Sequence, residues 1–313
     1  MEFKNIKKQL SNLIEERITP LITGDYVLWG LPNYRNEGDA LIWKGTTDFL
    51  KTIPYRCIDA HFYDEYEYRP LEKTIVILIF GGGYFGDTWR KAWEHVVKTI
   101  SLYPENPIVI LPQSINYQSE ESLNYDKEML RKCRHLTICA RDEQSYIFAR
   151  KHFDSHQVLL VPDMAFHIKD RRWSEQRGNG ILYIKREDKE LKPAKDQELT
   201  VVANKIADWP SIRGYRSIEF CFYVFSKIRR FWSRPFFHHM SLLWMKWVYR
   251  PLMIHNAVKF VDPFKGIYTT RLHAMILALM MGKEVHYLDN FYGKLSALHN
   301  TWLKDCDHLD RFE

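Results

Sequence analysis

The alternation of short apolar runs with helical patterns in the first half of the chain is the feature that most constrains the fold. Five runs of mostly β-branched or aliphatic residues predict buried strands, at Tyr26–Trp29, Ile75–Phe80, Ile108–Leu111, Val158–Val161 and Ile181–Ile184. Helical patterns lie between them, at Ala40–Leu50, Trp89–Leu102, Asp126–Lys132 and Glu143–Phe153. Strands that alternate with helices predict an α/β fold with a parallel sheet and right-handed crossovers.

The second half is less regular, but the same kinds of element recur there. The patterns predict helices at Leu252–Phe260, Leu272–Met281 and Lys294–Leu303, and strands at Gly266–Thr269 and Glu284–Leu288. A polar, basic stretch at Lys169–Gly180 separates the halves. A length of 313 residues is comfortable for two domains. We therefore predict domains at 1–172 and 173–313, with the terminal helix able to pack back on the first.

The composition indicates a packed globular protein. Hydrophobic residues make up 46% of the chain, and no run of about 18 apolar residues predicts a membrane-spanning helix. Met1–Arg17 alternates charged and apolar residues, unlike a signal peptide. The five cysteines form no CxxC pair and are expected to be reduced. We expect a cytoplasmic protein.

Two glycine-containing segments are candidate ligand loops. Asn36-Glu37-Gly38-Asp39 precedes a helix, where Asp39 could cap Ala40 and free amides attract anions; a plain turn with a cap is the alternative. Gly81-Gly82-Gly83 follows a strand and either lets a ligand approach the backbone or forms a strand-to-helix turn. Its spacing fits neither a dinucleotide-binding nor a Walker motif.

Arg141 follows the apolar run Leu136–Ala140, where the carboxyl end of a strand would face an interdomain crevice. Arginine binds carboxylate or phosphate in a bidentate manner, although a structural ion pair is an equal alternative. Asp163 and His167 are further crevice candidates.

Arg271 and His273 are the polar residues in the first turn of a helix that is otherwise apolar on every face. Thr270 is the expected N-cap and Gly282 the expected residue after the helix. Cationic side chains oppose the dipole at a helix N-terminus, so this turn predicts an anion nearby. The alternative is that Arg271 pairs with a carboxylate elsewhere in the protein. Lys294 follows a glycine turn and either reaches a phosphate or is solvated.

The segment Phe220–Val261 carries the excess positive charge of the chain, with seven Lys or Arg residues and no Asp or Glu. Within it, Lys227–Arg250 interleaves Trp, Phe and Tyr with cations, which suits an anionic membrane surface. A packed helical pair with solvated cations is the alternative. A nucleic-acid groove is disfavoured because no nucleic-acid fold motif is present. No HExxH motif or Cys/His spacing predicts a metal site, although His238 and His239 are adjacent.

The ordered set of motifs resembles the polysaccharide pyruvyltransferase family. The matching pieces are Asn36–Ile42, Phe80–Gly83, Ile110–Ile115, Ala140–Asp142 with Ser145, Pro162–Phe166, Arg271–Ala274 and Tyr287–Lys294. The resemblance implies two Rossmann-like domains facing a cleft, in a GT-B-like arrangement. It also implies phosphoenolpyruvate as donor, a sugar as acceptor, and a cyclic pyruvate ketal with released phosphate as products.

The resemblance places donor contacts and catalysis on Arg141, His273 and Lys294, with Arg271 beside them. We add Gly82 and Gly83 as donor contacts, and His273 or Asp39 as the group that delivers a proton to the donor methylene. Acceptor contacts are assigned to Asn36, Gly38, Asp163 and His167. No cofactor or metal is expected, because positive side chains can take the charge.

Two other functions remain open at this point. One is a glycosyltransferase of the same fold that uses a nucleotide sugar. The other is a membrane-surface module built on Lys227–Arg250. The favoured interpretation is a pyruvyltransferase at the inner membrane face that acts on a lipid-linked oligosaccharide.

Overall fold

The computed structural model of the chain contains two parallel β-sheets and their helices, and it describes residues 1–63, 69–169, 173, 178–188, 190, 202–210, 234–289 and 291–312. Every strand pair in both sheets is parallel. The predicted α/β class with parallel sheets is therefore confirmed.

The first sheet has seven strands in the order β2-β1-β3-β5-β6-β7, with β4 paired to β5 outside this path. Its strands are β1 (Tyr26–Leu31), β2 (Cys57–Phe62), β3 (Val76–Ile79), β4 (Gly82–Gly86), β5 (Ile108–Asn116), β6 (Leu136–Ala140) and β7 (Gln157–Leu160). The central strands are wholly buried, as expected for a parallel sheet with helices on both faces.

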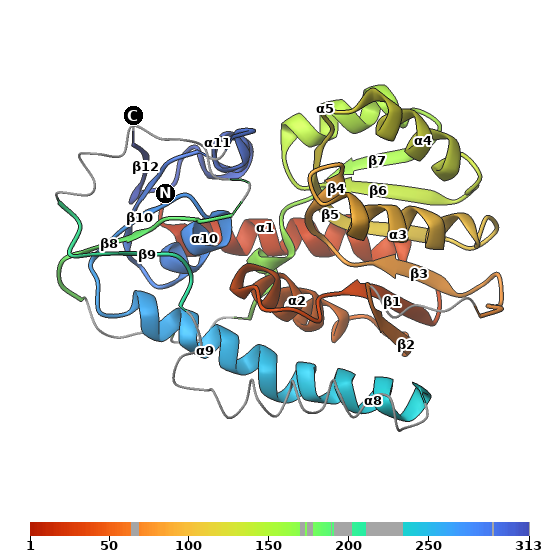
Figure 1. Cartoon of the computed structure of the whole chain (residues 1–313), viewed down its shortest axis with the longest axis horizontal. Coiled ribbons are helices and arrows are strands. Elements are labelled where there is room, and N and C mark those ends of the chain that lie inside the picture. The colour runs from red at the N-terminus through yellow and green to blue at the C-terminus, as the bar shows by residue number, and fades with distance from the viewer. Residues whose placement is uncertain are drawn as a thin grey trace.

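The helical elements of this half cover the sheet. They are α1 (Phe3–Ile18), η1 (Thr19–Leu21), α2 (Glu37–Leu50), α3 (Arg90–Ser101), α4 (Glu120–Leu130), α5 (Glu143–His152) and η2 (Met164–His167). Helix α1 runs between the two sheets in Figure 1 and packs on both η2 and a helix of the second half. It buries Ile6, Leu10, Ile14 and Ile18 at four-residue spacing.

The second sheet has five strands in the order β12-β11-β10-β8-β9. They are β8 (Ile181–Ile184), β9 (Lys205–Ala207), β10 (Gly266–Thr269), β11 (Glu284–Tyr287) and β12 (Leu309–Arg311). The helical elements here are α8 (Arg234–Trp244), η5 (Met245–Tyr249), α9 (Arg250–Val261), α10 (Leu272–Met280), α11 (Lys294–Leu298) and η6 (His299–Leu303), of which η5 and η6 are π-helical. The chain passes from the first sheet to the second between the end of β7 at Leu160 and the start of β8 at Ile181.

The helices α8 and α9 follow each other along one side of the molecule and pass beneath α2 and β2 (Figure 1). Arg250 anchors this arm, because its Nη1 donates to Thr47 Oγ1 at 2.9 Å and its guanidinium lies over the Trp43 ring. Of the segment Lys227–Arg250, residues 227–233 lie outside the described part of the chain. Among the described residues, no helix combines the length and apolar character that crossing a bilayer requires.

Two local expectations were wrong. Helix α2 begins at Glu37 and is capped by Asn36, whose side chain accepts from the amides of Gly38 and Asp39, so Asp39 lies inside the first turn and is not the cap. Thr270 does not cap α10; its hydroxyl accepts from the Arg186 amide, because strand β8 ends beside it. Gly282 does follow α10 with a φ of 68°, as predicted.

The glycine-rich segment after β3 is not the strand-to-helix turn of the alternative prediction, since residues 82–86 make the short strand β4. Gly86 has a φ of 125°, and a Cβ there would lie 1.9 Å from the Asn116 carbonyl oxygen. Only glycine allows β4 to lie so close to β5.

Candidate active site

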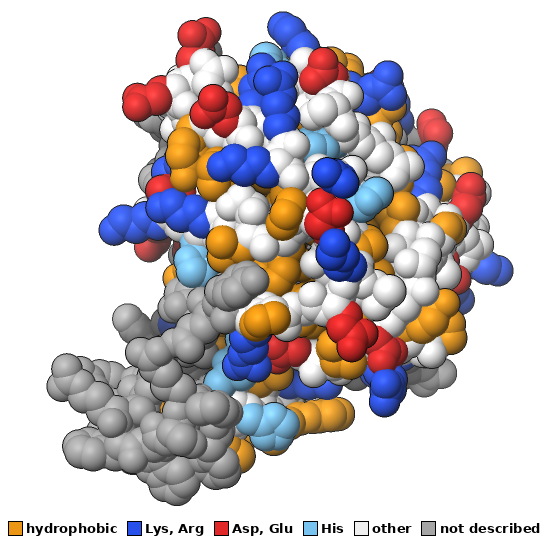
Figure 2. Space-filling view, turned by 90° about the vertical axis from the view of Figure 1, so that its right-hand side faces the viewer, with side chains coloured by type: hydrophobic (Ala, Val, Ile, Leu, Met, Phe, Trp, Pro, Cys, Tyr) orange, Lys and Arg blue, Asp and Glu red, His pale blue; other side chains and the backbone are white. Residues whose placement is uncertain are grey.

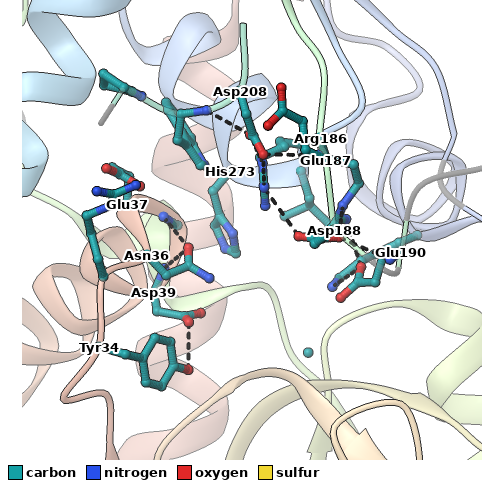
Figure 3. A pocket seen from close by; sticks show the side chains of 18 of the residues that line it. Tyr34, Asn36, Glu37, Asp39, Arg186, Glu187, Asp188, Glu190, Asp208 and His273 are labelled. Atoms are coloured by element: carbon teal, nitrogen blue, oxygen red, sulfur yellow. Dashed lines mark hydrogen bonds and ion pairs between the residues drawn. The ribbon is translucent and has the colours of Figure 1, made fainter. Parts of the chain in front are cut away.

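A cavity of about 1050 Å³ is lined by residues of both halves of the chain. The first half contributes the start of α2, β4 and the end of β6. The second half contributes the segments after β8 and β9 and the start of α10 and α11. Figure 3 shows His273 projecting between the Asn36–Asp39 turn on one side and Asp188 and Asp208 on the other. The volume can hold a small anion together with part of a sugar.

His273 lies in the first turn of α10, directly against the first turn of α2. A Cβ on Gly38 would be 2.7 Å from His273 Nδ1, so the approach of the two turns depends on this glycine. On its other side, His273 Nε2 lies 3.3 Å from Asp163 Oδ2. The imidazole is therefore held at both edges and is 12% exposed.

Arg141 is fully buried beneath the cavity, and most of its guanidinium is engaged. Its Nε donates to Ser114 Oγ at 2.8 Å and its Nη1 to Asp163 Oδ2 at 2.7 Å. Its Nη2 is buried and has no hydrogen-bond partner among the described residues. A buried donor left without a partner costs free energy, which favours an acceptor at this position.

Asp163 links His273 and Arg141. Burial alone would raise the pKa of its carboxyl, but His273 and Arg141 outweigh burial and hold that pKa well below its ordinary value. Asp163 does not itself line the cavity among the described residues. Its contacts make it a residue that positions His273 and Arg141, in contrast to the acceptor contact expected from the sequence.

The side chains of Lys294 and Arg141 both approach Gly83. A Cβ on Gly83 would lie 2.5 Å from Lys294 Nζ and 2.9 Å from Arg141 Nη2. Lys294 is 10% exposed, so it is not the solvated lysine of the alternative prediction, and its Nζ lies 3.5 Å from Glu190 Oε2. Gly83 lines the cavity, whereas the described lining does not include Gly82.

Asp39 faces the cavity from α2, and its Oδ2 accepts from the Tyr34 hydroxyl at 2.8 Å (Figure 3). Burial raises the pKa of the Asp39 carboxyl, while His273 and Lys294 oppose the rise. A raised pKa makes this carboxyl hold a proton more readily than an exposed aspartate does.

Arg271 is neutralised by protein carboxylates. It pairs with Asp208 through Nε and Nη2, and its Nη2 lies 3.2 Å from Asp188 Oδ2. The anion that this helix end requires is thus supplied from within the protein, as the alternative reading of the sequence held. Arg271 still lines the cavity.

A network of charged side chains that the sequence did not predict forms one wall of the cavity. Arg186 donates to Asp188 and Glu190, and Glu190 also accepts from Trp89 Nε1 at 3.0 Å across the cavity. Burial opposes ionisation of Glu190, but Lys294 and Arg186 prevail and lower the pKa of its carboxyl strongly. The only sequence signal was Arg186 following the apolar run of β8, the same position that drew attention to Arg141.

His167 is not among the described residues that line the cavity. Its Nε2 lies 2.8 Å from Glu15 Oε1 of α1, and its ring contacts Phe49 edge-on. The terminal element η6 does reach the first half, because Trp302 Nε1 donates to the Arg141 carbonyl at 2.7 Å.

The parallel sheets and a polar cavity at strand ends and helix starts define an α/β protein with a candidate ligand site lined by both halves of the chain. A family model described as polysaccharide pyruvyl transferase matches residues 36–290. The chain belongs to this family, and it is a transferase of the pyruvyl-transferring class.

Among the similar proteins is EpsO of Bacillus subtilis (strain 168), named as a candidate pyruvyl transferase, which is 29% identical over 306 residues, covering 96% of this chain and 91% of EpsO. Pyruvyl transferase 1 of Schizosaccharomyces pombe is 25% identical over 302 residues, with 89% of this chain and 70% of that protein covered. A crystal structure of an uncharacterized Klebsiella pneumoniae protein has the same fold, with a TM-score of 0.59, 17% identity and 99% of each chain covered.

Proposed function

We propose that the chain transfers pyruvate from phosphoenolpyruvate to a sugar of a lipid-linked polysaccharide repeat unit, with formation of a cyclic ketal and release of phosphate. The observation that carries the proposal is the meeting of Arg141 Nη2 and Lys294 Nζ at Gly83, with His273 and Asp39 in the same cavity. The two Rossmann-like halves are proposed to work as a GT-B-like pair with the cavity as their cleft.

The cavity is mixed in charge rather than uniformly basic. Its described lining includes six Lys or Arg residues (Arg35, Arg141, Arg186, Lys205, Arg271 and Lys294) and six Asp or Glu residues (Glu37, Asp39, Glu187, Asp188, Glu190 and Asp208). An anionic donor is therefore expected where Arg141 and Lys294 converge at Gly83. The carboxylates elsewhere are acceptors for sugar hydroxyls, and Trp89 and Tyr63 offer apolar faces for a sugar ring.

The proposed reaction begins with transfer of a proton to the methylene carbon of phosphoenolpyruvate, which makes the central carbon electrophilic. Either Asp39 or His273 delivers this proton, since both face the cavity. One sugar hydroxyl attacks the central carbon and loses its proton, and the bond to phosphate breaks. A second hydroxyl attacks the same carbon, loses its proton and closes the ketal. The two hydroxyls release two protons in all. One of them restores the group that protonated the methylene carbon, and the other goes to the released phosphate.

Arg141 and Lys294 are proposed to neutralise the carboxylate and phosphate of the donor by charge-assisted hydrogen bonds. Asp163 keeps the imidazole of His273 and the guanidinium of Arg141 in place. No step in this sequence requires a metal or an organic cofactor.

Membrane association is the second part of the proposal, because a lipid-linked acceptor lies at a bilayer surface and an enzyme for it would act at the inner face, in the cytoplasm. The described part of the aromatic-basic segment exposes Met240, Leu243 and Trp247, the last to 67%. On the face shown in Figure 2, Lys and Arg side chains are interspersed with Asp and Glu, without one large basic patch. The proposed contact therefore rests on α8 and η5, and no nucleic-acid partner is proposed.

A ligand-dependent thermal shift distinguishes the proposed donor from that of a nucleotide-sugar glycosyltransferase. Phosphoenolpyruvate should raise the melting temperature of the full-length chain, because a ligand that binds only the folded state stabilises it. Stabilisation by uridine diphosphate sugars, with none by phosphoenolpyruvate, would favour the glycosyltransferase instead.

A further inference from the structure

A second cluster of chemically capable side chains lies where the edge strand β2 meets α8. Asp59 and His61 are two residues apart on β2 and therefore project from the same face of the strand. His238 approaches them from α8. One donor atom from each of the three residues lies within 4.8 Å of the others. None of them is among the described residues that line the active-site cavity.

The contacts within the cluster orient the two imidazoles. His61 Nε2 lies 2.7 Å from Asp59 Oδ2, and the His61 side chain is 3% exposed. The His238 ring stacks on that of His61, with centroids 4.4 Å apart. His238 Nε2 donates to the Ala60 carbonyl oxygen at 2.7 Å, which fixes the tautomer and keeps a lone pair on Nδ1. A histidine that donates its other ring N–H to a backbone carbonyl is arranged as metal-binding histidines are.

Two imidazole nitrogens and one carboxylate form a donor set that suits Zn²⁺, with water able to complete a tetrahedral site. His61 Nε2 and Asp59 Oδ2 lie 2.7 Å apart as a hydrogen-bonded pair, whereas two ligand atoms on one tetrahedral Zn²⁺ lie about 3.3 Å apart. Binding therefore replaces this hydrogen bond with a small outward shift, and the stacked His238 ring must turn so that its nitrogen faces the same ion. Arg69 Nη1 lies 3.8 Å from Asp59 Oδ2, but Arg69 is 54% exposed and can move into solvent. Cys57 lies on the same strand and is exposed, with its Sγ directed at the Asp59 carbonyl at 3.3 Å.

We propose that Asp59, His61 and His238 bind one zinc-class divalent cation, which joins α8 to the edge of the first sheet. The bound ion would hold in place α8, which is part of the aromatic-basic segment, against the edge strand β2. This inference is independent of the proposed reaction, because it uses different residues and a different surface.

The test is zinc binding by the full-length chain after chelator treatment and gel filtration. Bound zinc is counted per chain by mass spectrometry, and its affinity is measured by competition with a chromogenic chelator. We expect one zinc per chain. His238→Ala should lower the affinity by more than the roughly 10–100-fold that loss of an outer hydrogen-bonding partner costs. Asp59→Asn should weaken binding in the same direction.

His239→Ala is the matched control, because His239 is the exposed neighbour of His238 on the same helix. It should bind zinc as the unaltered chain does. Cobalt substitution gives a second readout, since a tetrahedral site produces visible absorption bands that His238→Ala should abolish. The proposal is overturned if the unaltered chain binds no zinc at micromolar concentration, if His238→Ala binds it equally well, or if His239→Ala loses binding to the same extent.

Discussion

Arg141 and Asp163 form an ion pair that is almost completely shielded from solvent, with Nη1 of Arg141 2.7 Å from Oδ2 of Asp163 and exposures of 0% and 1%. The same carboxylate oxygen lies 3.3 Å from His273 Nε2. One buried carboxylate thus positions the two residues on which the proposed chemistry depends. Removing it should affect both stability and activity.

Asp163→Asn should lower the free energy of unfolding by up to about 3–5 kcal/mol at neutral pH, because it leaves the Arg141 charge buried without its partner. The pKa of Asp163 is held well below its ordinary value, so its contribution is present above roughly pH 3.9 and is lost as the pH falls further. Urea unfolding over a pH series should therefore show the two proteins converging in acid. The exposed Asp154→Asn is the control, and a deficit in Asp163→Asn that persists unchanged in acid would contradict the account.

Gly38→Ala should reduce turnover while the fold is kept. The added Cβ would lie 2.7 Å from His273 Nδ1, so the imidazole must move away from its place between α2 and Asp163. A displacement of about 1 Å can cost on the order of 100-fold in rate. Gly266→Ala is the control, because its Cβ would make only an ordinary contact at 3.5 Å with Ile181. Steady-state phosphate release measures both, and equal rates would show that His273 tolerates the shift.

The contribution of Glu37 to the free energy of unfolding depends on pH in the opposite direction to that of Asp163. Burial raises the pKa of its carboxyl to about 7, although Arg35 and Arg271 oppose the rise. The pKa of Glu37 is therefore higher in the folded chain than the value of roughly 4.3 in the unfolded chain. The stability that Glu37 contributes is fully present below about pH 4.3 and is lost as the pH rises to about 7. Glu37→Gln should match the unaltered chain near pH 4 and be more stable at pH 8, by up to about 1.4 kcal/mol per unit of pKa shift.

The exposed cavity residue Glu187 provides the comparison for Glu37, because Glu187→Gln removes the same charge without relieving a buried carboxylate. Thermal unfolding at both pH values measures the effect. A gain of the same size in Glu187→Gln would assign it to net charge rather than to burial.

Lys294→Ala should weaken the stabilisation by phosphoenolpyruvate. Loss of one hydrogen bond to a charged group costs about 1.5–3 kcal/mol, or roughly 10–100-fold in affinity. Lys304→Ala removes an exposed lysine from the end of the next helix and should bind the donor normally. Calorimetric titration compares the two variants, and unchanged binding by Lys294→Ala would remove Lys294 from the proposed donor site.

The proposed membrane contact predicts that Trp247→Ser and Leu243→Ser reduce sedimentation with anionic phospholipid vesicles, because both side chains are exposed on the α8–η5 arm. Ile147→Ser is the control, since Ile147 is 60% exposed on α5. Neutralising Arg229, Arg230 and Arg234 should weaken association further, although Arg229 and Arg230 lie outside the described residues. Equal sedimentation of all variants would refute the contact.

The sequence predicted the central strands and the buried helix α10 because their apolar character follows directly from burial on every side. It missed β2, β9 and β12, which lie at sheet edges. Strands β9 and β12 have only three residues each, and β2 mixes polar and partly exposed residues with apolar ones, so none of them has a clear periodic signal. The strand at residues 82–86 was not predicted, because glycine is rare in strands, yet the close approach of Gly86 to Asn116 requires glycine there.

Much of the candidate site was recognisable from single motifs, because Arg141, His273, Lys294 and Asp39 all lie at strand ends or helix starts. Their partners were not recognisable. Asp208 neutralises Arg271 from a segment far along the chain, and His238 meets Asp59 and His61 across an even longer separation. Pairings of this kind depend on how the elements pack, which no local spacing encodes.

Mass spectrometry of the acceptor glycan after incubation with phosphoenolpyruvate tests the central claim most directly. The account predicts that the full-length chain adds one pyruvate less one water to a lipid-linked oligosaccharide and releases one phosphate per product. His273→Ala should remain folded and form no product. If the glycan gains no such mass from phosphoenolpyruvate with any polysaccharide repeat unit tested, or if His273→Ala turns over at a near-normal rate, the proposed donor and the proposed site are contradicted.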